Sequence, residues 1–349
     1  MAARTGASTR LPDARRLAIW IAGLTIGAVT LWLLGDVLLL VFAAALLAVG
    51  LRGGAERVSG LVGCTPRIGL LLVSLSILLL MAGAAVLGGT HLADQGSQLW
   101  DQLGNAVAQV RDWLRQYSWG RSIVAGASPQ ESAQQGQRLA SNLGVAVMGM
   151  IGGLASIVIV LVAALYFAAT PGDYIGGLVR LLPKRRRRRA HEVLGAVGAT
   201  LRQWLAAQGL SMLLITAMSY IGLLLLGVPM ALLLSLIVGL TNFVPYIGPI
   251  AGAIPAVLVA FGAGMQTVLG TVALFAGIQF IEGNLIQPLL QKRMTRLPPA
   301  LTILSQTLLG TLFGIGGVIL ATPVLAVTLV AVRMLYVEDV LGDRAAADE

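Results

Sequence analysis

The sequence has little charge and almost no cysteine or histidine, and these shortages exclude several classes of function. Charged residues make up 11% of the 349 residues, against about 25% in a typical soluble domain. The single cysteine, Cys64, excludes an intramolecular disulfide, and two separated histidines do not form a metal site. No Walker loop, GxGxxG element or nucleophile–base arrangement is present. We therefore predict that the protein is not an enzyme, is not driven by ATP and uses no cofactor.

Acidic residues are scarcer than basic ones, while apolar residues are abundant. The 15 Asp and Glu against 24 Lys and Arg give a formal net charge of +9, and 57% of the residues are hydrophobic. In such an apolar chain, basic residues between apolar runs are typical of cytoplasmic loops rather than of nucleic-acid binding. The 43 glycines exceed the average share of about 7% and suit close helix packing in lipid. The sequence predicts an all-α, polytopic integral membrane protein in a lipid bilayer, without a nucleic-acid partner.

Apolar runs recur along the chain, and we expect about eight transmembrane helices. A cytoplasmic tail, residues 1–16, precedes helices 1–3 in residues 17–90, and helix 4 occupies residues 143–169. A transmembrane core in residues 211–337 leads to a cytoplasmic tail, residues 338–349. The first run is long enough to span and has no cleavage pattern after it, so we interpret it as a retained helix. The individual runs are 17–34, 37–51, 68–90, 143–169, 211–226, 228–261, 267–281, 300–309 and 318–334.

Residues 91–142 form the one long polar section, which we place outside the cytoplasm. Apolar residues recur in it at alternating spacings of three and four, which predicts an amphipathic helix. This helix lies either on the bundle and membrane surface or between subunits, because a stripe alone does not name its partner. The residues of the stripe are Trp100, Leu103, Val107, Val110, Leu114 and Tyr117.

Residues 170–210 contain a basic loop, with the run KRRRRR at positions 184–189. From residue 191 to residue 210, Leu194, Val197, Leu201 and Leu205 share one face, which predicts an interfacial helix beside anionic headgroups. We place five segments on the cytoplasmic side: this loop, both termini, the loop at residues 51–67 and the connection at residues 282–298. This arrangement puts 20 of the 24 Lys and Arg inside. The positive-inside rule favours this orientation.

The run at residues 228–261 cannot be one plain helix, because prolines and glycines crowd its middle. Pro245, Pro249 and Pro255 each lack a backbone donor, and Gly248 and Gly252 easily adopt non-helical angles. Broken helices of this kind form the midplane sites of secondary transporters. A second interruption separates the last two apolar runs, so we expect discontinuous or re-entrant segments in the C-terminal half. We interpret the hinge positions as Gly252, Pro255, Gly310, Gly314, Gly316 and Gly317.

Glu282 is the only acidic residue between Arg202 and Arg333. Ionisable groups at membrane depth mark ion or substrate pathways, and burial favours a neutral carboxyl that could exchange a proton near neutral pH. Alternatively, Glu282 ends its span in interfacial water beside Lys292 or Arg293, Asn242 caps a half-helix and Tyr246 anchors at an interface. The predicted substrate and ion pathway comprises Asn242, Pro245, Tyr246, Gly248, Pro249, Gln279, Glu282, Asn284, Gln287 and Pro288.

Three stretches in this order resemble the autoinducer-2 exporter family, also seen as PerM-like permeases. They are VGLTNFVPYIGPIAGAIP at residues 238–255, IEGNLIQPLL at residues 281–290 and GTLFGIGGVILATPVLAV at residues 310–327. The resemblance covers residues 17–341, with little of it in the outer polar section. Gly283 stands where the family usually has the first Asn of a pair, and residues 296–299 depart from the family's usual histidine-containing connection.

The resemblance implies a bacterial inner-membrane secondary transporter that exports a small polar metabolite or signalling molecule, driven by an ion gradient. It also implies a homo-oligomer, with a pentamer as the expected form. Because some relatives look like monovalent cation/proton antiporters, a sodium/proton antiporter is the second hypothesis. The third hypothesis is a scaffold without transport, which recruits a cytoplasmic partner through the arginine run or the C-terminal tail.

Overall fold

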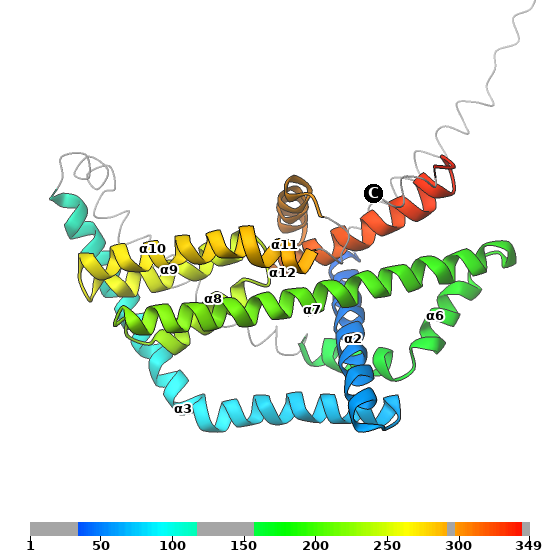
Figure 1. Cartoon of the computed structure of the whole chain (residues 1–349), viewed down its shortest axis with the longest axis horizontal. Helices are drawn as coiled ribbons and strands as arrows, with labels where there is room; N and C mark the ends of the chain where they lie inside the picture. Colours follow the sequence, from blue (N-terminus) through cyan, green and yellow to red (C-terminus); the bar gives the residue numbers. More distant parts are fainter. Residues whose placement is uncertain (1–33, 117–156, 292–296, 344–349) are drawn as a thin grey trace, which may run out of the picture.

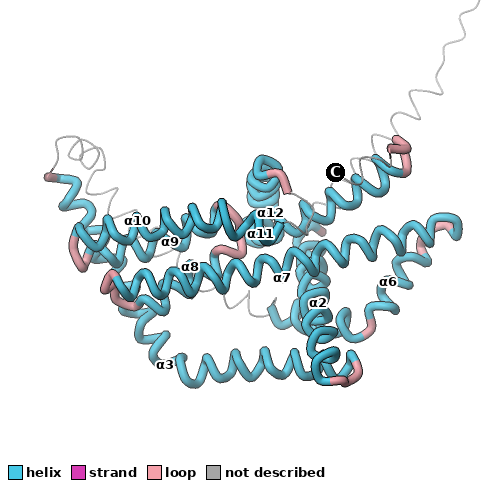
Figure 2. The backbone as a smooth tube through the Cα atoms, viewed as in Figure 1, coloured by secondary structure: helices cyan, strands magenta, loops and turns pink. Residues whose placement is uncertain are grey.

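The computed structural model describes residues 34–116, 157–291 and 297–343. Within these ranges the regular structure is helical and no strand occurs, which confirms the all-α prediction (Figure 2). Four helices in the described ranges are long and apolar enough to cross a membrane, or five if one bent pair is counted as a span. Shorter apolar helices accompany them. The predicted first span, residues 17–34, and most of the predicted fourth span lie outside the described residues.

Two long helices, α2 (Gly35–Val62) and α3 (Pro66–Arg115), pack against each other. The sequence predicts a polar loop from residue 51, but α2 continues through it to a turn at Gly63, where φ is 72°. Arg52 Nε donates to Glu56 Oε1 at 3.1 Å, and an i,i+4 pair of this kind supports a continuing helix. Arg52 and Arg57 therefore lie on a helix, not in a loop.

The first part of the predicted outer polar section continues α3. Leu99 is buried, and Leu103 packs beside it in the same apolar core as α8 and α9, so this part of α3 lies on the bundle. Tyr117 and the side chains of Trp100, Val107 and Leu114 lie outside the described residues.

The helix Ile157–Ala169 turns by 86° into α6 (Pro171–Arg180). A 3-10 turn, η1 (Lys184–Arg186), then leads into α7 (Arg187–Leu225), a single helix of 39 residues. The sequence predicts an interfacial helix followed by a separate span here, and that division is wrong. No proline interrupts residues 187–225, so the helical hydrogen-bond ladder can continue.

The apolar face predicted for the interfacial helix is instead part of a core. Leu201 is buried with Trp204, Leu46 and Leu320, and Val197 and Leu205 pack against them. Burial against protein removes this face from contact with headgroups. Arg202 adds a polar contact between α7 and α2, because its Nη1 donates to Glu56 Oε2 at 2.7 Å.

Helices α8 (Ala231–Thr241) and α9 (Ile247–Phe261) form a helical hairpin. Residues 242–246 make the turn, so the interruption predicted from prolines and glycines is confirmed. Pro249 is the third residue of α9, where a backbone donor has no intrahelical partner in any case. Pro255 lies inside α9, which continues past it, and its role as a hinge stays a prediction. Helices α7 to α10 run alongside one another (Figure 1).

After the hairpin, α10 (Met265–Ile281) continues into a π-turn, η2 (Glu282–Ile286), and then into α11 (Gln287–Gln291). The predicted span at residues 267–281 therefore does not end at Glu282. Gln287 N–H donates to Glu282 O, the i→i−5 bond of a π-turn.

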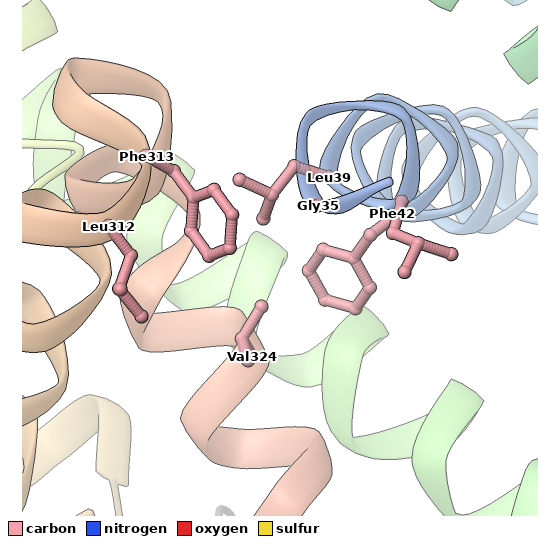
Figure 3. Close-up of a pocket in the computed structure, with 7 residues that line it drawn as sticks. Gly35, Leu39, Phe42, Leu312, Phe313 and Val324 are labelled. Carbon is pink, nitrogen blue, oxygen red and sulfur yellow. The ribbon is translucent and has the colours of Figure 1, made fainter. Parts of the chain in front are cut away.

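The last helix, α12 (Pro299–Val332), is followed by η3 (Arg333–Glu338). Its hydrogen-bond ladder is interrupted at Gly314, where φ is 62° and ψ is −146°, so the second predicted interruption is confirmed. At this break, side chains from α2 and from both parts of α12 face an apolar pocket of about 510 Å³ (Figure 3). A Cβ at Gly35 would overlap the Phe313 ring, so a larger residue there requires this ring to move.

The start of α7 is tied to the end of the chain's described part. Arg189 donates to Glu338 Oε2 at 2.7 Å, to Asp339 Oδ2 at 3.0 Å and to the Met334 carbonyl at 2.8 Å. Arg187 donates to the carbonyls of residues 180 and 182. At least two arginines of the basic run therefore make intramolecular contacts.

Candidate functional site

Three polar side chains meet where the hairpin turn approaches α7 and the π-turn. Asn242 Nδ2 donates to Glu282 Oε1 at 3.2 Å and lies 3.3 Å from Ser211 Oγ. Ser211 Oγ also donates to Glu282 Oε1, at 3.1 Å. Asn242 is 1% exposed and Glu282 is 6% exposed. We call Ser211, Asn242 and Glu282 the polar cluster.

Two helices, α7 and α12, hold the turn that carries Asn242. Gln208 Nε2, from α7, donates to the Asn242 carbonyl at 2.6 Å. Gln306 Nε2, from α12, donates to the Pro245 carbonyl at 2.9 Å. The rings of Trp204 and Phe243 meet edge to face, with centroids 5.4 Å apart. These contacts satisfy carbonyls that the break releases from the helix, as buried backbone at membrane depth requires.

The polar cluster offers unused hydrogen-bond acceptors. Both donors reach the same carboxyl oxygen of Glu282, and no described residue donates to Oε2. Asn242 Oδ1 is fully buried and has no hydrogen-bond partner among the described residues. A buried polar atom without a partner is unfavourable, so such atoms in a native site call for an explanation. A proton, a cation or a ligand with a donor group would satisfy these two oxygens.

Tyr246 and the close approach of the two hairpin helices fix the geometry of the turn. Tyr246 has φ 68° and ψ −54°, an unusual conformation for a non-glycine residue. Gly248 passes directly over the Thr241 carbonyl, and Gly252 passes over Val238, where only glycine leaves enough room.

The structure brings some of the predicted pathway residues together and not others. Asn242 and Glu282 are in direct contact, and Pro245, Tyr246, Gly248 and Pro249 lie in or beside the turn. The alternative in which Glu282 ends its span in interfacial water is contradicted by its burial. Lys292 and Arg293, its possible partners in that alternative, lie outside the described residues.

Among the described residues, no hydrogen bond joins the polar cluster to the side chains of four predicted pathway residues of α10, η2 and α11. Backbone bonds do occur, because the Glu282 N–H donates to the Gln279 carbonyl and the Gln287 N–H donates to the Glu282 carbonyl. Gln279 is exposed, and Asn284 donates back to the Phe280 carbonyl of its own helix at 2.9 Å. Gln287 is half-buried and Pro288 is exposed, both on α11. A role for these four residues in the pathway stays a prediction.

Sequence reasoning missed Ser211, Gln208 and Gln306. A weak signal was available, because Gln208 and Ser211 are three residues apart on one helix and therefore share a face. Likewise, Thr302 and Gln306, four residues apart in an apolar run, are both buried. Among the described residues, no group of three or more His, Cys, Asp or Glu could hold a metal ion.

Comparison with known proteins gives one family. A sequence model of the family described as "AI-2E family transporter" matches residues 18–336, which is most of the chain. The chain is 37% identical to "Putative transport protein YrrI" of Bacillus subtilis over 147 residues, 42% of each chain. It is 29% identical to "Putative transport protein MT0215" of Mycobacterium tuberculosis over 270 residues, 74% of each chain.

The chain is also similar to "Putative permease PerM" of Escherichia coli, with 28% identity over 183 residues, 49% of this chain and 51% of PerM. The chain thus spans about half the length of YrrI and of PerM.

Proposed function

Because the chain belongs to the AI-2E family transporters, we propose that it is a secondary transporter which exports a small polar metabolite or signalling molecule. The export crosses the bacterial inner membrane and is driven by an ion gradient. Family membership confirms the resemblance found in the sequence, whereas the solute and the driving ion are part of the proposal. An autoinducer-2-like molecule is the solute that the family description suggests.

The observation that supports this proposal is the buried carboxyl of Glu282 at the hairpin turn. A carboxyl with little contact with water is costly to keep charged unless its donors or a bound cation compensate. Proton binding and release at Glu282 therefore change the charge of a site that the hairpin turn touches through Asn242.

In the proposed mechanism, the charge of Glu282 controls the position of the hairpin turn. The ionised carboxylate holds Asn242 and Ser211 through its Oε1, and a hydrogen bond to a charged group is about twice as strong as one to a neutral group. Protonation weakens this hold, so the turn can separate from η2. The solute then binds to the oxygens and carbonyls that the turn exposes.

Transport of autoinducer-2 by purified protein in proteoliposomes, with an imposed pH gradient, tests this mechanism. The variant Glu282→Gln retains an acceptor for Asn242 and Ser211 but cannot titrate, so we expect its flux to lose its dependence on the pH gradient. Asp173→Asn is the control, because it removes an exposed carboxyl on α6 and should behave as wild type. Flux of Glu282→Gln that still follows the gradient would remove Glu282 from the coupling step.

A sodium/proton antiporter is the second candidate, and the chemistry of the unused acceptors favours it. Asn242 Oδ1 and Glu282 Oε2 are both oxygens without a described donor, and oxygen ligands at broken helices coordinate sodium in other transporters. Proton movement that depends on sodium and occurs with no metabolite present would favour this candidate over export.

We also propose that both termini face the cytoplasm and that the protein is a homo-oligomer, with a pentamer as the expected form. The contacts from Arg189 to Glu338 and Asp339 support the cytoplasmic position of the C-terminal end, because they hold the end of the described chain beside the basic run. The mass of the detergent-solubilised particle, corrected for bound detergent, tests the oligomeric state.

A further inference from the structure

An apolar groove of about 410 Å³ lies directly beside the polar cluster, between α9 and α10. Its lining includes Ile215 of α7, Val238 of α8 and Ile278 of α10. Each of these residues is four positions, or about one helical turn, from the member of the polar cluster that lies on the same helix or directly follows it. Whether the groove residue comes before or after the cluster residue in the sequence also matters, because α7 runs opposite to α8 and α10.

On α7 the groove residue, at position 215, follows the cluster residue at position 211. On α8 and α10 the order is reversed, because positions 238 and 278 precede the cluster residues at 242 and 282. Since consecutive helices of this bundle alternate in direction (Figure 1), all three groove residues lie in the same direction from the cluster. The groove lining therefore starts about one helical turn from the polar cluster, whose three residues are not themselves part of the lining. It follows α9 from Pro249 to Leu258, which is about 14 Å at the rise of an α-helix.

The open side of the groove is apolar as well. Ile250, Ile254 and Val272 line it and are each about half exposed. In a bundle embedded in a membrane, such a surface borders hydrocarbon rather than water, so a molecule with an aliphatic chain can enter from the side. Gln279, the polar residue of the lining, lies at the end nearest Glu282.

The polar cluster, about one helical turn beyond the groove lining, favours a donor group with positive charge. The two unused atoms of the polar cluster, Asn242 Oδ1 and Glu282 Oε2, are acceptors only. Glu282 also carries the single acidic group between Arg202 and Arg333. An ammonium head satisfies both oxygens and neutralises the buried carboxylate, whereas an anionic head would be repelled.

We propose that the groove and the polar cluster form one binding site for an amphipathic amine. The ammonium head contacts Glu282 and Asn242, and a single aliphatic tail lies in the groove between α9 and α10. This inference rests on the proposed transport function and narrows its solute to a molecule with a polar, donor-bearing head and an apolar body.

Saturable binding of radiolabelled decylammonium to the purified protein in nanodiscs, with no ion gradient, tests the site. The variant Ala276→Phe fills the groove, and we expect it to weaken binding by at least about tenfold, a loss near 1.4 kcal/mol. The matched control is Ala273→Phe, because Ala273 is exposed on the same helix but is not part of the groove lining. It should bind as wild type. Ile254→Phe, on the α9 wall, provides a second block if Ala276→Phe unfolds.

Two further probes test the head. Glu282→Gln should weaken decylammonium binding, and unlabelled decanoate, which has a similar tail and the opposite charge, should not compete. Equal binding by Ala276→Phe and Ala273→Phe would overturn the groove as the tail site. Equal competition by decanoate would also overturn the proposal and indicate an ordinary lipid tail. Loss of oligomer mass in Ala276→Phe, with decylammonium binding unchanged, would assign the groove to a second copy of the chain.

These results are separable from the proposed transport. If decylammonium fails to bind but autoinducer-2 flux still depends on Glu282, the groove proposal fails and the export proposal stands. If decylammonium binds as expected but Glu282→Gln leaves the pH dependence of flux unchanged, the coupling mechanism fails and the binding site stands.

Discussion

Replacement of Gly248 by alanine tests whether the hairpin of α8 and α9 closes as tightly as the structure shows. Gly248 is buried in the first turn of α9. A Cβ at this position would overlap the Thr241 carbonyl oxygen and would lie 2.6 Å from the Thr241 carbonyl carbon and 3.2 Å from the Asn242 nitrogen. All three atoms belong to the backbone, so no side-chain rotamer can relieve the overlap.

The cost follows from the size of the displacement. Overpacking of this kind typically costs about 1–3 kcal/mol, and relief here requires the two helices to separate by roughly 1 Å. The displaced turn carries Asn242, whose 3.2 Å bond to Glu282 is already at the long end of hydrogen-bond distances. Gly248→Ala should therefore lower stability and also separate Asn242 from Glu282.

The measurement is the apparent melting temperature in one detergent, together with pH-driven flux in proteoliposomes. We expect a decrease of about 5 °C and a loss of most of the flux. The control is Gly277→Ala on α10, because a Cβ there would meet no atom within 4 Å and alanine stabilises a helix by about 0.5–1 kcal/mol relative to glycine. Wild-type melting and flux in Gly248→Ala would refute the close packing of the hairpin.

Two further predictions concern contacts outside the polar cluster. Arg189→Ala should raise backbone hydrogen exchange in η3 a few-fold, because its contacts with Glu338 and Asp339 are lost; unchanged exchange would show that these ion pairs do not hold η3. Gln306→Ala should lower stability by about 2 kcal/mol through the cavity and the lost bond to Pro245 O. Gln306→Leu should lower the melting temperature less than Gln306→Ala, since it loses the same bond but fills the space and removes the unpaired Oε1, and equal damage by both variants would contradict this account.

The interrupted helices could be predicted from the sequence because their cause is local. Pro245 and Gly248 act on their own backbone, and the turn at residues 242–246 lies where they predict it. Glu282 could be chosen because a lone acidic residue in an apolar region is visible in one dimension. Asn242 could be chosen in the same way, since it is also a polar residue in an apolar run.

The continuity of α7 and the contribution of Ser211 could not be predicted in this way. Hydropathy divides residues 187–225 at the point where polar residues become rare, but a helix continues wherever nothing breaks its ladder. Ser211 is one of several small polar residues on α7, and Ser219 is equally buried. Which of them meets the hairpin depends on how far α7 extends past the turn, and that is set by tertiary packing.

The two irregular stretches of backbone in this part of the bundle touch each other, and their proximity suggests a common purpose. The turn at residues 242–246 gives up helical hydrogen bonds, and the π-turn at residues 282–286 replaces α-helical bonds with wider ones. Either feature costs free energy, and π-turns frequently occur at functional sites. Here Asn242 of the first is bonded to Glu282, the first residue of the second. A rigid scaffold would gain nothing from both, whereas a transporter needs one place where backbone can rearrange when a single charge changes.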